Sequence, residues 1–167
     1  AALLMQLLIN IDPQTFADSR TFKQRWAGHA LAIIVVLPFL LIWRRLPREW
    51  IAGSKSVAET LLILGLTFLV GQVVFLNWLN ESLGQIARGY WMFLFVTWTA
   101  VRLGPAGAVM VILVVAIQGL LGAQLGLGFF SNDIAKTGLS NYFYYTLCFS
   151  AVGMALATYF SERMDKE

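Results

Sequence analysis

The sequence contains few charged residues and a single cysteine, and each shortage excludes a class of protein or a kind of bond. Charged residues make up 13% of the chain, whereas ordinary soluble domains contain about 25%. Cys148 has no second cysteine within the chain, so no internal disulfide forms. The net charge of +3, without a basic cluster interleaved with aromatic residues, argues against nucleic acid as a partner.

Patterns that carry catalysis or metal binding are also missing. His29 is the only histidine, so a histidine-based metal or haem site would lack its second ligand. The chain has no Ser-His-Asp set, no paired intramembrane carboxylates, no Walker loop and no dinucleotide fingerprint. We therefore predict that the chain is not an enzyme, and we expect no catalytic residue, no metal and no cofactor.

Long apolar runs are what the sequence does contain. Hydrophobic residues make up 59% of it, and runs at 29–43, 61–79 and 106–122 approach the ~20 residues that cross a bilayer core. Segments of alternating polarity, typical of membrane barrels, are missing. Since lipid offers no partners for backbone groups, the spans should be helical. The sequence therefore predicts an all-α fold, a polytopic transmembrane helical bundle in contact with membrane lipids.

We predict five full spans and one partial N-terminal span in a single integral membrane domain, 1–167. The partial span covers about 1–9 and ends at Asp12-Pro13. The full spans cover about 25–43, 57–79, 88–103, 105–127 and 142–161. The segment 129–142 has the Gly, Asn and Ser of a loop. Because the chain starts without Met and stops in a polar stub, we expect it to be part of a longer protein.

The distribution of basic residues predicts the orientation. Arg102 closes an inward-running span, and Gly104-Pro105 turns the chain into the next span. With this topology, seven basic residues lie on the side of the short RRLPR loop and five on the other. The positive-inside rule then puts the C-terminus in the cytoplasm, in a bacterial inner membrane.

Polar residues within the spans are the candidates for ligand binding or for hydrogen bonds between helices. They are His29, Gln72, Asn77, Gln118 and Gln124. The sequence leaves open whether they bind a ligand or join helices. We predict an ion pair between Glu59 and Arg102, because isolated charges at membrane depth are costly; separate snorkelling of the two side chains is the alternative. The run of small residues in 119–128 predicts close helix packing.

Three local patterns resemble the first type of membrane-associated sensor domain (the MASE group). They are RWAGHALAIIVVLPFLLIW with Trp26, Gly28 and Pro38, WTAVRLGPAGA with Trp98, Arg102 and Gly104, and ATYFSERMDKE with Glu162 and Arg163. The resemblance covers about 20–167 and implies the C-terminal part of such a domain. The family often has an acidic residue where Gly28-His29 stands, so no role of that carboxylate carries over.

The resemblance implies a sensory input and anchoring domain for signal transduction, as in two-component systems. In this family the output domain is a histidine kinase, a diguanylate cyclase or a similar cytoplasmic module of the full-length chain. We expect ligand or partner binding to shift the last span, with a homodimer or a membrane protein partner as further expectations. Two alternatives stay open: the substrate-binding membrane subunit of a small-molecule transporter, and a non-catalytic accessory subunit of a membrane complex.

Overall fold

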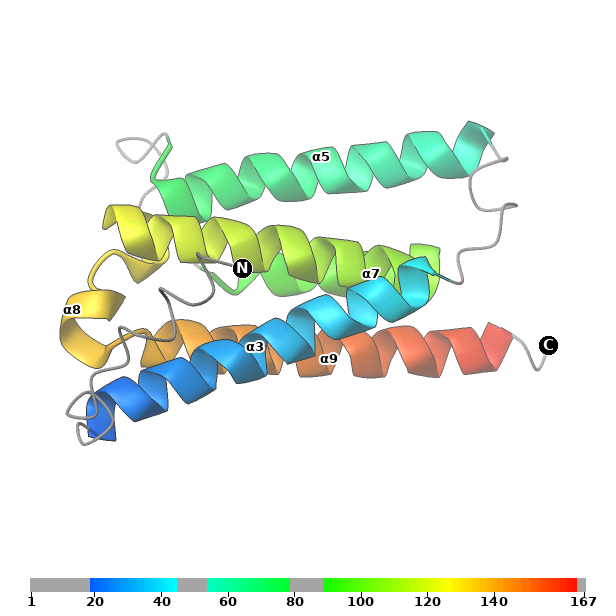
Figure 1. The fold of residues 1–167 in the computed structure, drawn as a ribbon. Coiled ribbons are helices and arrows are strands. Elements are labelled where there is room, and N and C mark those ends of the chain that lie inside the picture. Colours follow the sequence, from blue (N-terminus) through cyan, green and yellow to red (C-terminus); the bar gives the residue numbers. More distant parts are fainter. Residues whose placement is uncertain (1–18, 45–53, 79–88, 165–167) are drawn as a thin grey trace, which may run out of the picture.

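The computed structural model describes residues 19–44, 54–78 and 89–164, which form a bundle of helices without strands (Figure 1). The helices are α3 Ser19–Trp43, α5 Ser54–Leu76, α7 Trp91–Leu125, η1 Gly128–Phe130, α8 Asp133–Thr137 and α9 Ser140–Met164. Four of them, α3, α5, α7 and α9, are long and apolar enough to cross a membrane. The prediction of an all-α multi-pass membrane bundle is confirmed. The predicted partial span at 1–9 lies outside the described residues.

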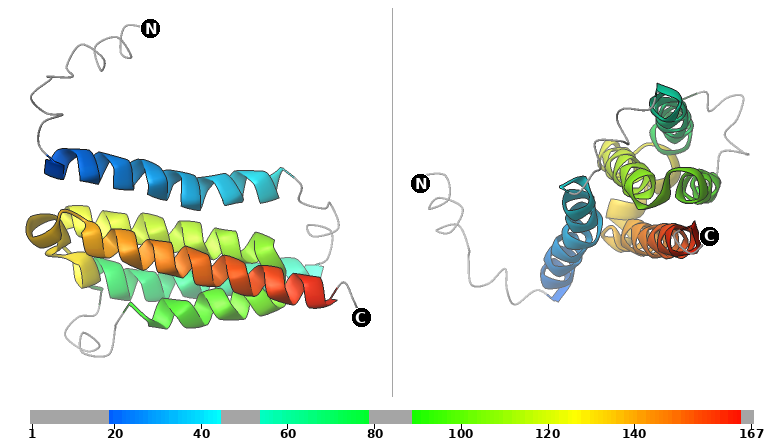
Figure 2. Two further views of the ribbon diagram at one scale, coloured as in Figure 1. Left: turned by 90° about the horizontal axis from the view of Figure 1, so that it is seen from below. Right: turned by 90° about the vertical axis from the view of Figure 1, so that its right-hand side faces the viewer.

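The α7 helix reverses direction at Gly104. This residue has φ 64° and ψ −155°, a conformation that a side chain would strain, and Pro105 follows it in the chain. Residues 91–103 and 105–125 therefore form two halves, which appear as separate green and yellow-green cylinders when the bundle is viewed end-on (Figure 2, right). The turn predicted at Gly104-Pro105 is present, although both flanking segments belong to one element.

The two halves of α7 pack against each other closely beside the turn. A Cβ atom on Gly107 would lie 2.5 Å from the Leu103 Cβ and 2.6 Å from the Thr99 Cγ2, so only glycine fits there. The Thr99 hydroxyl donates to the Phe95 carbonyl at 2.6 Å within its own helix, which satisfies this buried polar group. A tight helical hairpin therefore stands at the centre of the bundle.

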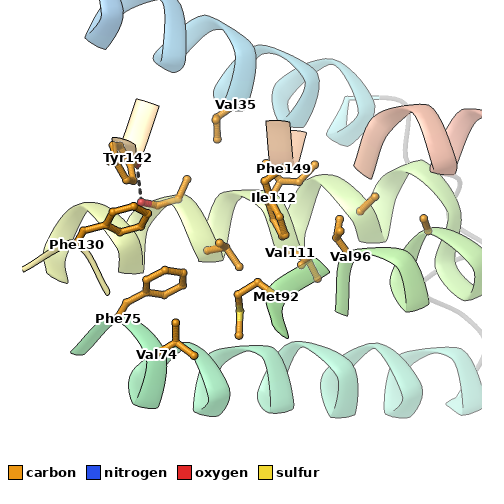
Figure 3. Packing of buried hydrophobic residues seen from close by; sticks show 14 of the residues in the cluster. Val35, Val74, Phe75, Met92, Val96, Val111, Ile112, Phe130, Tyr142 and Phe149 are labelled. Carbon is orange, nitrogen blue, oxygen red and sulfur yellow. Dashed lines mark hydrogen bonds between the residues drawn. The ribbon is translucent and has the colours of Figure 1, made fainter. Parts of the chain in front are cut away.

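Around this hairpin, α5 packs on one side and α3 and α9 pack on the other (Figures 1 and 2). Large apolar side chains from α5, α7 and α9 form the core between them (Figure 3). The core includes Phe75, Met92, Val96, Val111, Ile112 and Phe149. By contrast, Val35 is the only buried side chain among those described on α3. The α3 helix is therefore the most peripheral of the four.

The segment 129–142 contains more helix than the loop that the sequence predicts. It contains the end of η1, the one-turn helix α8 and the first turn of α9. Left-handed glycines separate these pieces, with φ 67° at Gly126 and 63° at Gly138. The sequence correctly marks Gly138 as part of a turn, but the five residues Asp133–Thr137 form a helical turn, in which Asp133 is bonded from two sides.

The small residues of 119–128 allow α5 and α7 to approach at backbone distance. A Cβ atom on Gly122 would lie 2.2 Å from the Phe75 carbonyl oxygen, and one on Gly128 would lie 2.3 Å from the same atom. A backbone carbonyl cannot move aside as a flexible side chain can. These two glycines therefore set the distance between the end of α5 and the end of α7, as expected from the small-residue run.

We predict that Gly122→Ala lowers the stability of the bundle, because the new methyl group forces α5 away from α7. Overpacking of this kind costs about 1–3 kcal/mol. The matched control is Gly65→Ala in the same bundle, where a Cβ atom would meet nothing within 4 Å. Thermal unfolding in detergent can be monitored by the loss of the monodisperse peak. The midpoint temperature should be lower than that of the wild type for Gly122→Ala but not for Gly65→Ala. Equal midpoints for both variants would contradict this packing.

Candidate functional site

The carboxylate of Asp133 joins α8 to the start of α9. Asp133 is only 5% exposed. Its Oδ2 accepts a 2.8 Å hydrogen bond from the backbone N–H of Tyr142, and its Oδ1 accepts one from the Thr137 hydroxyl. Tyr142 is the third residue of α9, where an N-cap side chain normally bonds. Asp133 therefore caps α9 from nine residues upstream, and its negative charge suits the positive end of the helix dipole.

Two tyrosines fix the same end of α9 to the rest of the bundle. The Tyr142 hydroxyl donates to the Ala116 carbonyl of α7 at 2.7 Å, the bond drawn in Figure 3. The Tyr145 hydroxyl donates to the Gly89 carbonyl, just before α7, at 2.6 Å. With the carboxylate of Asp133, these bonds tie the first two turns of α9 to α8, to the second half of α7 and to the residues just before α7.

The rings around these bonds form an aromatic cluster. Its members are Phe75, Phe93, Phe129, Phe130, Tyr142, Tyr145 and Phe149. The Phe130 ring stacks on Phe75 at 5.8 Å and meets Tyr142 edge-on at 5.5 Å. Such pairs contribute about 0.5–1.5 kcal/mol each beyond their buried area. The cluster therefore makes this end of the bundle a rigid frame for the α8–α9 junction.

The turn between α8 and α9 is strained. Gly138 and Leu139 are both left-handed, with φ 63° and 70°. For leucine this conformation costs roughly 1–2 kcal/mol. The Leu139 N–H donates to the Asp133 carbonyl at 3.3 Å, and the Ser140 hydroxyl donates to the Thr137 carbonyl at 2.8 Å. The strain persists because bonds on both sides hold the turn, an arrangement found at sites that change conformation.

A recess of about 400 Å³ opens beside this junction. It is lined by Phe129, Phe130, Ser131, Asn132, Asp133, Lys136, Thr137, Asn141, Tyr144 and Tyr145. Its wall thus combines aromatic rings with amide, hydroxyl and ammonium groups, and it contains the carboxylate that caps α9. We take this junction, with its recess, as the candidate functional site.

The candidates predicted from polarity are not gathered at this site. His29 on α3 and Gln124 on α7 are exposed, and Gln72 on α5 is half-buried. Asn77 is exposed and left-handed, with φ 62°, and ends α5, where the Trp78 N–H donates to the Gln72 carbonyl at 3.3 Å. Within the described residues, the side chains of these four form no hydrogen bond with one another. Asparagine tolerates the left-handed conformation that ends α5, and this explains Asn77 without a ligand.

Gln118 is the fifth candidate and joins two helices. It is 3% exposed, and its Nε2 donates to the Phe68 carbonyl of α5 at 2.9 Å. Its Oε1 is buried and lacks a hydrogen-bond partner among the described residues. A Cβ atom on Gly71 would lie 2.0 Å from that oxygen, so glycine makes room for the amide. The geometry is that of an interhelical bond between α5 and α7.

The structure brings Glu59 and Arg102 together at the opposite end of the bundle. The Arg102 Nε donates to the Glu59 Oε1 at 2.7 Å, and the side chains are 59% and 31% exposed, respectively. Since Arg102 lies two residues before Gly104, the pair ties α5 to the turn of the α7 hairpin. An exposed ion pair contributes little free energy of folding. Its main effect is to fix the position of α5 relative to the turn of α7.

The remaining positions of the sensor-domain pattern lie mostly on the outside. Trp26 and Trp98 face outward, and no atom lies within 4 Å of a Cβ placed on Gly28. Pro38 lies within α3, which continues through it. Glu162 and Arg163 are exposed in the last turns of α9. None of these residues contributes to the recess.

Sequence reasoning missed Asp133, Tyr142 and Tyr145. A cap is normally sought at the residue next to the helix, which here is Leu139. The carboxylate instead comes from a separate one-turn helix, and no local spacing signals that arrangement. The sequence does not show that the hydroxyls of the two tyrosines meet backbone carbonyls. The available signal was the one acidic residue of the segment 129–142.

The apolar helices, with charged residues at their ends, define a multi-pass helical membrane domain. Within the described residues, no three His, Cys, Asp or Glu side chains gather to hold a metal ion. The MASE1 family model matches residues 2–163, nearly the whole chain, and the chain belongs to this family. MASE1 domains are membrane sensor domains of signalling proteins and are not catalytic.

The family match confirms the resemblance found in the sequence and extends it. The resemblance covered about 20–167, whereas the matched region begins at residue 2 and so includes the N-terminal apolar segment. Comparisons with curated proteins and with solved structures found no significant match. The functional argument therefore rests on the family and on the geometry of this chain.

We predict that Asp133→Ala destabilises the start of α9, because the Tyr142 N–H and the Thr137 hydroxyl both lose their acceptor. Loss of an N-cap costs about 0.5–2 kcal/mol, and a buried unpaired donor adds to this. Asp133→Asn keeps one acceptor and should fall between Ala and the wild type. Thermal unfolding in detergent checks this order, and an Ala variant as stable as the wild type would contradict the capping role.

We predict that reversing one charge of the Glu59–Arg102 pair lowers the unfolding midpoint, because two like charges then face each other at the turn of α7. The double variant Glu59→Arg, Arg102→Glu should recover part of the loss. High salt should shrink the differences, because both side chains are exposed. A double variant no more stable than the worse single variant would show that the two side chains act separately.

Proposed function

We propose that this MASE1 domain is the sensory input and membrane anchor of a bacterial signalling protein. Its output domain would be a cytoplasmic histidine kinase or diguanylate cyclase module that follows α9 in the full-length chain. The observation that carries the proposal is α9 itself. This helix runs without interruption for 25 residues, from the capped and strained junction with α8 to the exposed Glu162 and Arg163.

The mechanism follows from how α9 is held. At its start it is fixed by the Asp133 carboxylate and by the hydroxyl bonds of Tyr142 and Tyr145. Along its length it packs against α7 and α3. A stimulus that favours a different geometry of the α8–α9 turn would shift or rotate α9 as a rigid rod. Signalling then requires that the stimulus bind the two arrangements with different affinities.

The same proposal includes the orientation and the number of spans. Because the chain reverses at Gly104, the two halves of α7 would each cross the membrane, which makes five crossings in the described residues. Arg44, Arg102 and Arg163 follow or close segments that run toward the same end of the bundle. By the positive-inside rule, they support a cytoplasmic C-terminus in the inner membrane. The recess would then face the outside of the cell.

Family membership supports sensing over the two alternatives left by the sequence, a transporter subunit and an accessory subunit. A homodimer is the expected assembly, because kinases and cyclases of this kind work as pairs. Lipids would cover the outward apolar faces of the bundle.

We predict that Tyr142→Phe changes the basal output of the full-length protein, because it keeps the ring but removes the hydroxyl, which bonds to the Ala116 carbonyl and interacts with Thr146. Losing one hydrogen bond of about 1 kcal/mol changes a two-state equilibrium about fivefold. The measurement is autophosphorylation or cyclic dinucleotide synthesis in membranes, at equal protein amounts. The matched control is Tyr159→Phe on the outer face of the same helix, where the side chain is exposed and its hydroxyl bonds to no other described residue.

The result expected is an altered output for Tyr142→Phe and an unaltered output for Tyr159→Phe. If both variants match the wild type while Tyr142→Phe is measurably less stable, α9 does not relay the state of its first turns, and the proposed mechanism fails.

A further inference from the structure

The two charged groups of the recess differ in how accessible they are. Its one acid, Asp133, is buried and directs its two carboxylate oxygens to Tyr142 and Thr137. Its one base, Lys136, is exposed three residues later in α8 and forms no ion pair with any residue in the described part of the chain. The formal charges of the two groups cancel, but the carboxylate oxygens are already bonded inside the wall. The charged group that the recess presents to a ligand is therefore the ammonium of Lys136.

Neutral polar groups accompany this ammonium group in the wall. Asn132 and Asn141 line the recess and are exposed, and each carries an amide that donates two hydrogen bonds. The Asn132 amide reaches only the neighbouring Ser131 hydroxyl, at a long 3.4 Å. Ammonium and amide groups together suit a carboxylate, because bonds to an ionised acceptor are about twice as strong as neutral ones.

The rest of the wall is aromatic. Phe129 and Tyr144 are both more than a third exposed, and both line the recess together with Phe130 and Tyr145. Ligand sites combine such apolar surface with a few polar groups that fix orientation, and the volume of about 400 Å³ falls within the usual range for small molecules. A ring of a bound molecule would pack against these side chains with favourable geometry.

We propose that this recess binds a small aromatic carboxylate. Its carboxylate pairs with the Lys136 ammonium and accepts from the asparagine amides, while its ring packs on the aromatic wall. The inference rests on the proposed function, which it deepens by naming the stimulus class. A molecule bound there touches α8 and α9 at once, and Asp133 is the group that joins those two helices. Occupancy therefore acts on the cap of α9 directly.

The test uses the chain in nanodiscs of phosphatidylcholine, with 4-fluorophenylacetate as the probe and fluorine NMR as the readout. We expect saturable broadening of the probe signal and little broadening for the neutral 4-fluorophenylacetamide. Lys136→Gln should weaken probe binding about tenfold, the effect of losing one charge-assisted bond. The control Arg44→Gln, at the opposite end of the bundle, should leave binding unchanged.

Three outcomes would overturn the site: equal binding of acid and amide, equal binding to the wild type and Lys136→Gln, or displacement of the probe by phosphatidylglycerol in the disc. The third outcome would assign the recess to lipid headgroups. Failure of the proposed function looks different. In that case the probe binds in a Lys136-dependent way, yet Tyr142→Phe leaves the output of the full-length protein unchanged.

Discussion

The buried carboxylate of Asp133 is the interaction on which this end of the bundle depends. A carboxylate removed from water needs donors for its oxygens, and here they are a backbone N–H of α9 and the hydroxyl of Thr137. The carboxylate also lies at the positive end of the α9 dipole. In return, the carboxylate holds α8 against α9 and keeps Leu139 in its strained left-handed conformation. The helix that leads to the C-terminus therefore starts from a strained junction that hydrogen bonds hold in place.

The two ends of the bundle are built on different principles. At one end, α7 turns on two residues, Gly104 and Pro105, with an exposed ion pair beside the turn. At the other end, η1, α8 and a cluster of aromatic rings form several connected turns around a recess. Backbone contacts at Gly122 and Gly128 fix the end of α5 against the end of α7 at this second end. Local rearrangement is cheapest where strain and polar bonds concentrate, which in this domain is the α8–α9 junction.

Much of this fold is predictable from the sequence, because lipid allows few solutions. Apolar run length locates α3, α5, α7 and α9, and Gly104-Pro105 marks the reversal. The family resemblance rests on the same apolar runs and on the Gly, Pro and Trp residues within and between them. The site is not predictable in this way, since Asp133 acts on a helix that begins seven residues later, and hydroxyl bonds to backbone carbonyls leave no pattern in a sequence. Gln118 illustrates the limit: polarity identified it, but only the structure shows that it bonds to α5.

Hydrogen exchange at the backbone amide of Tyr142 tests the central claim most directly. The account predicts slow exchange in the wild type, because the amide donates to the Asp133 carboxylate, and much faster exchange over the first turns of α9 in Asp133→Ala. Amides in the middle of α7, which do not depend on this cap, should exchange as in the wild type. Unchanged protection at Tyr142 in the variant would contradict the account, because α9 would then begin independently of α8.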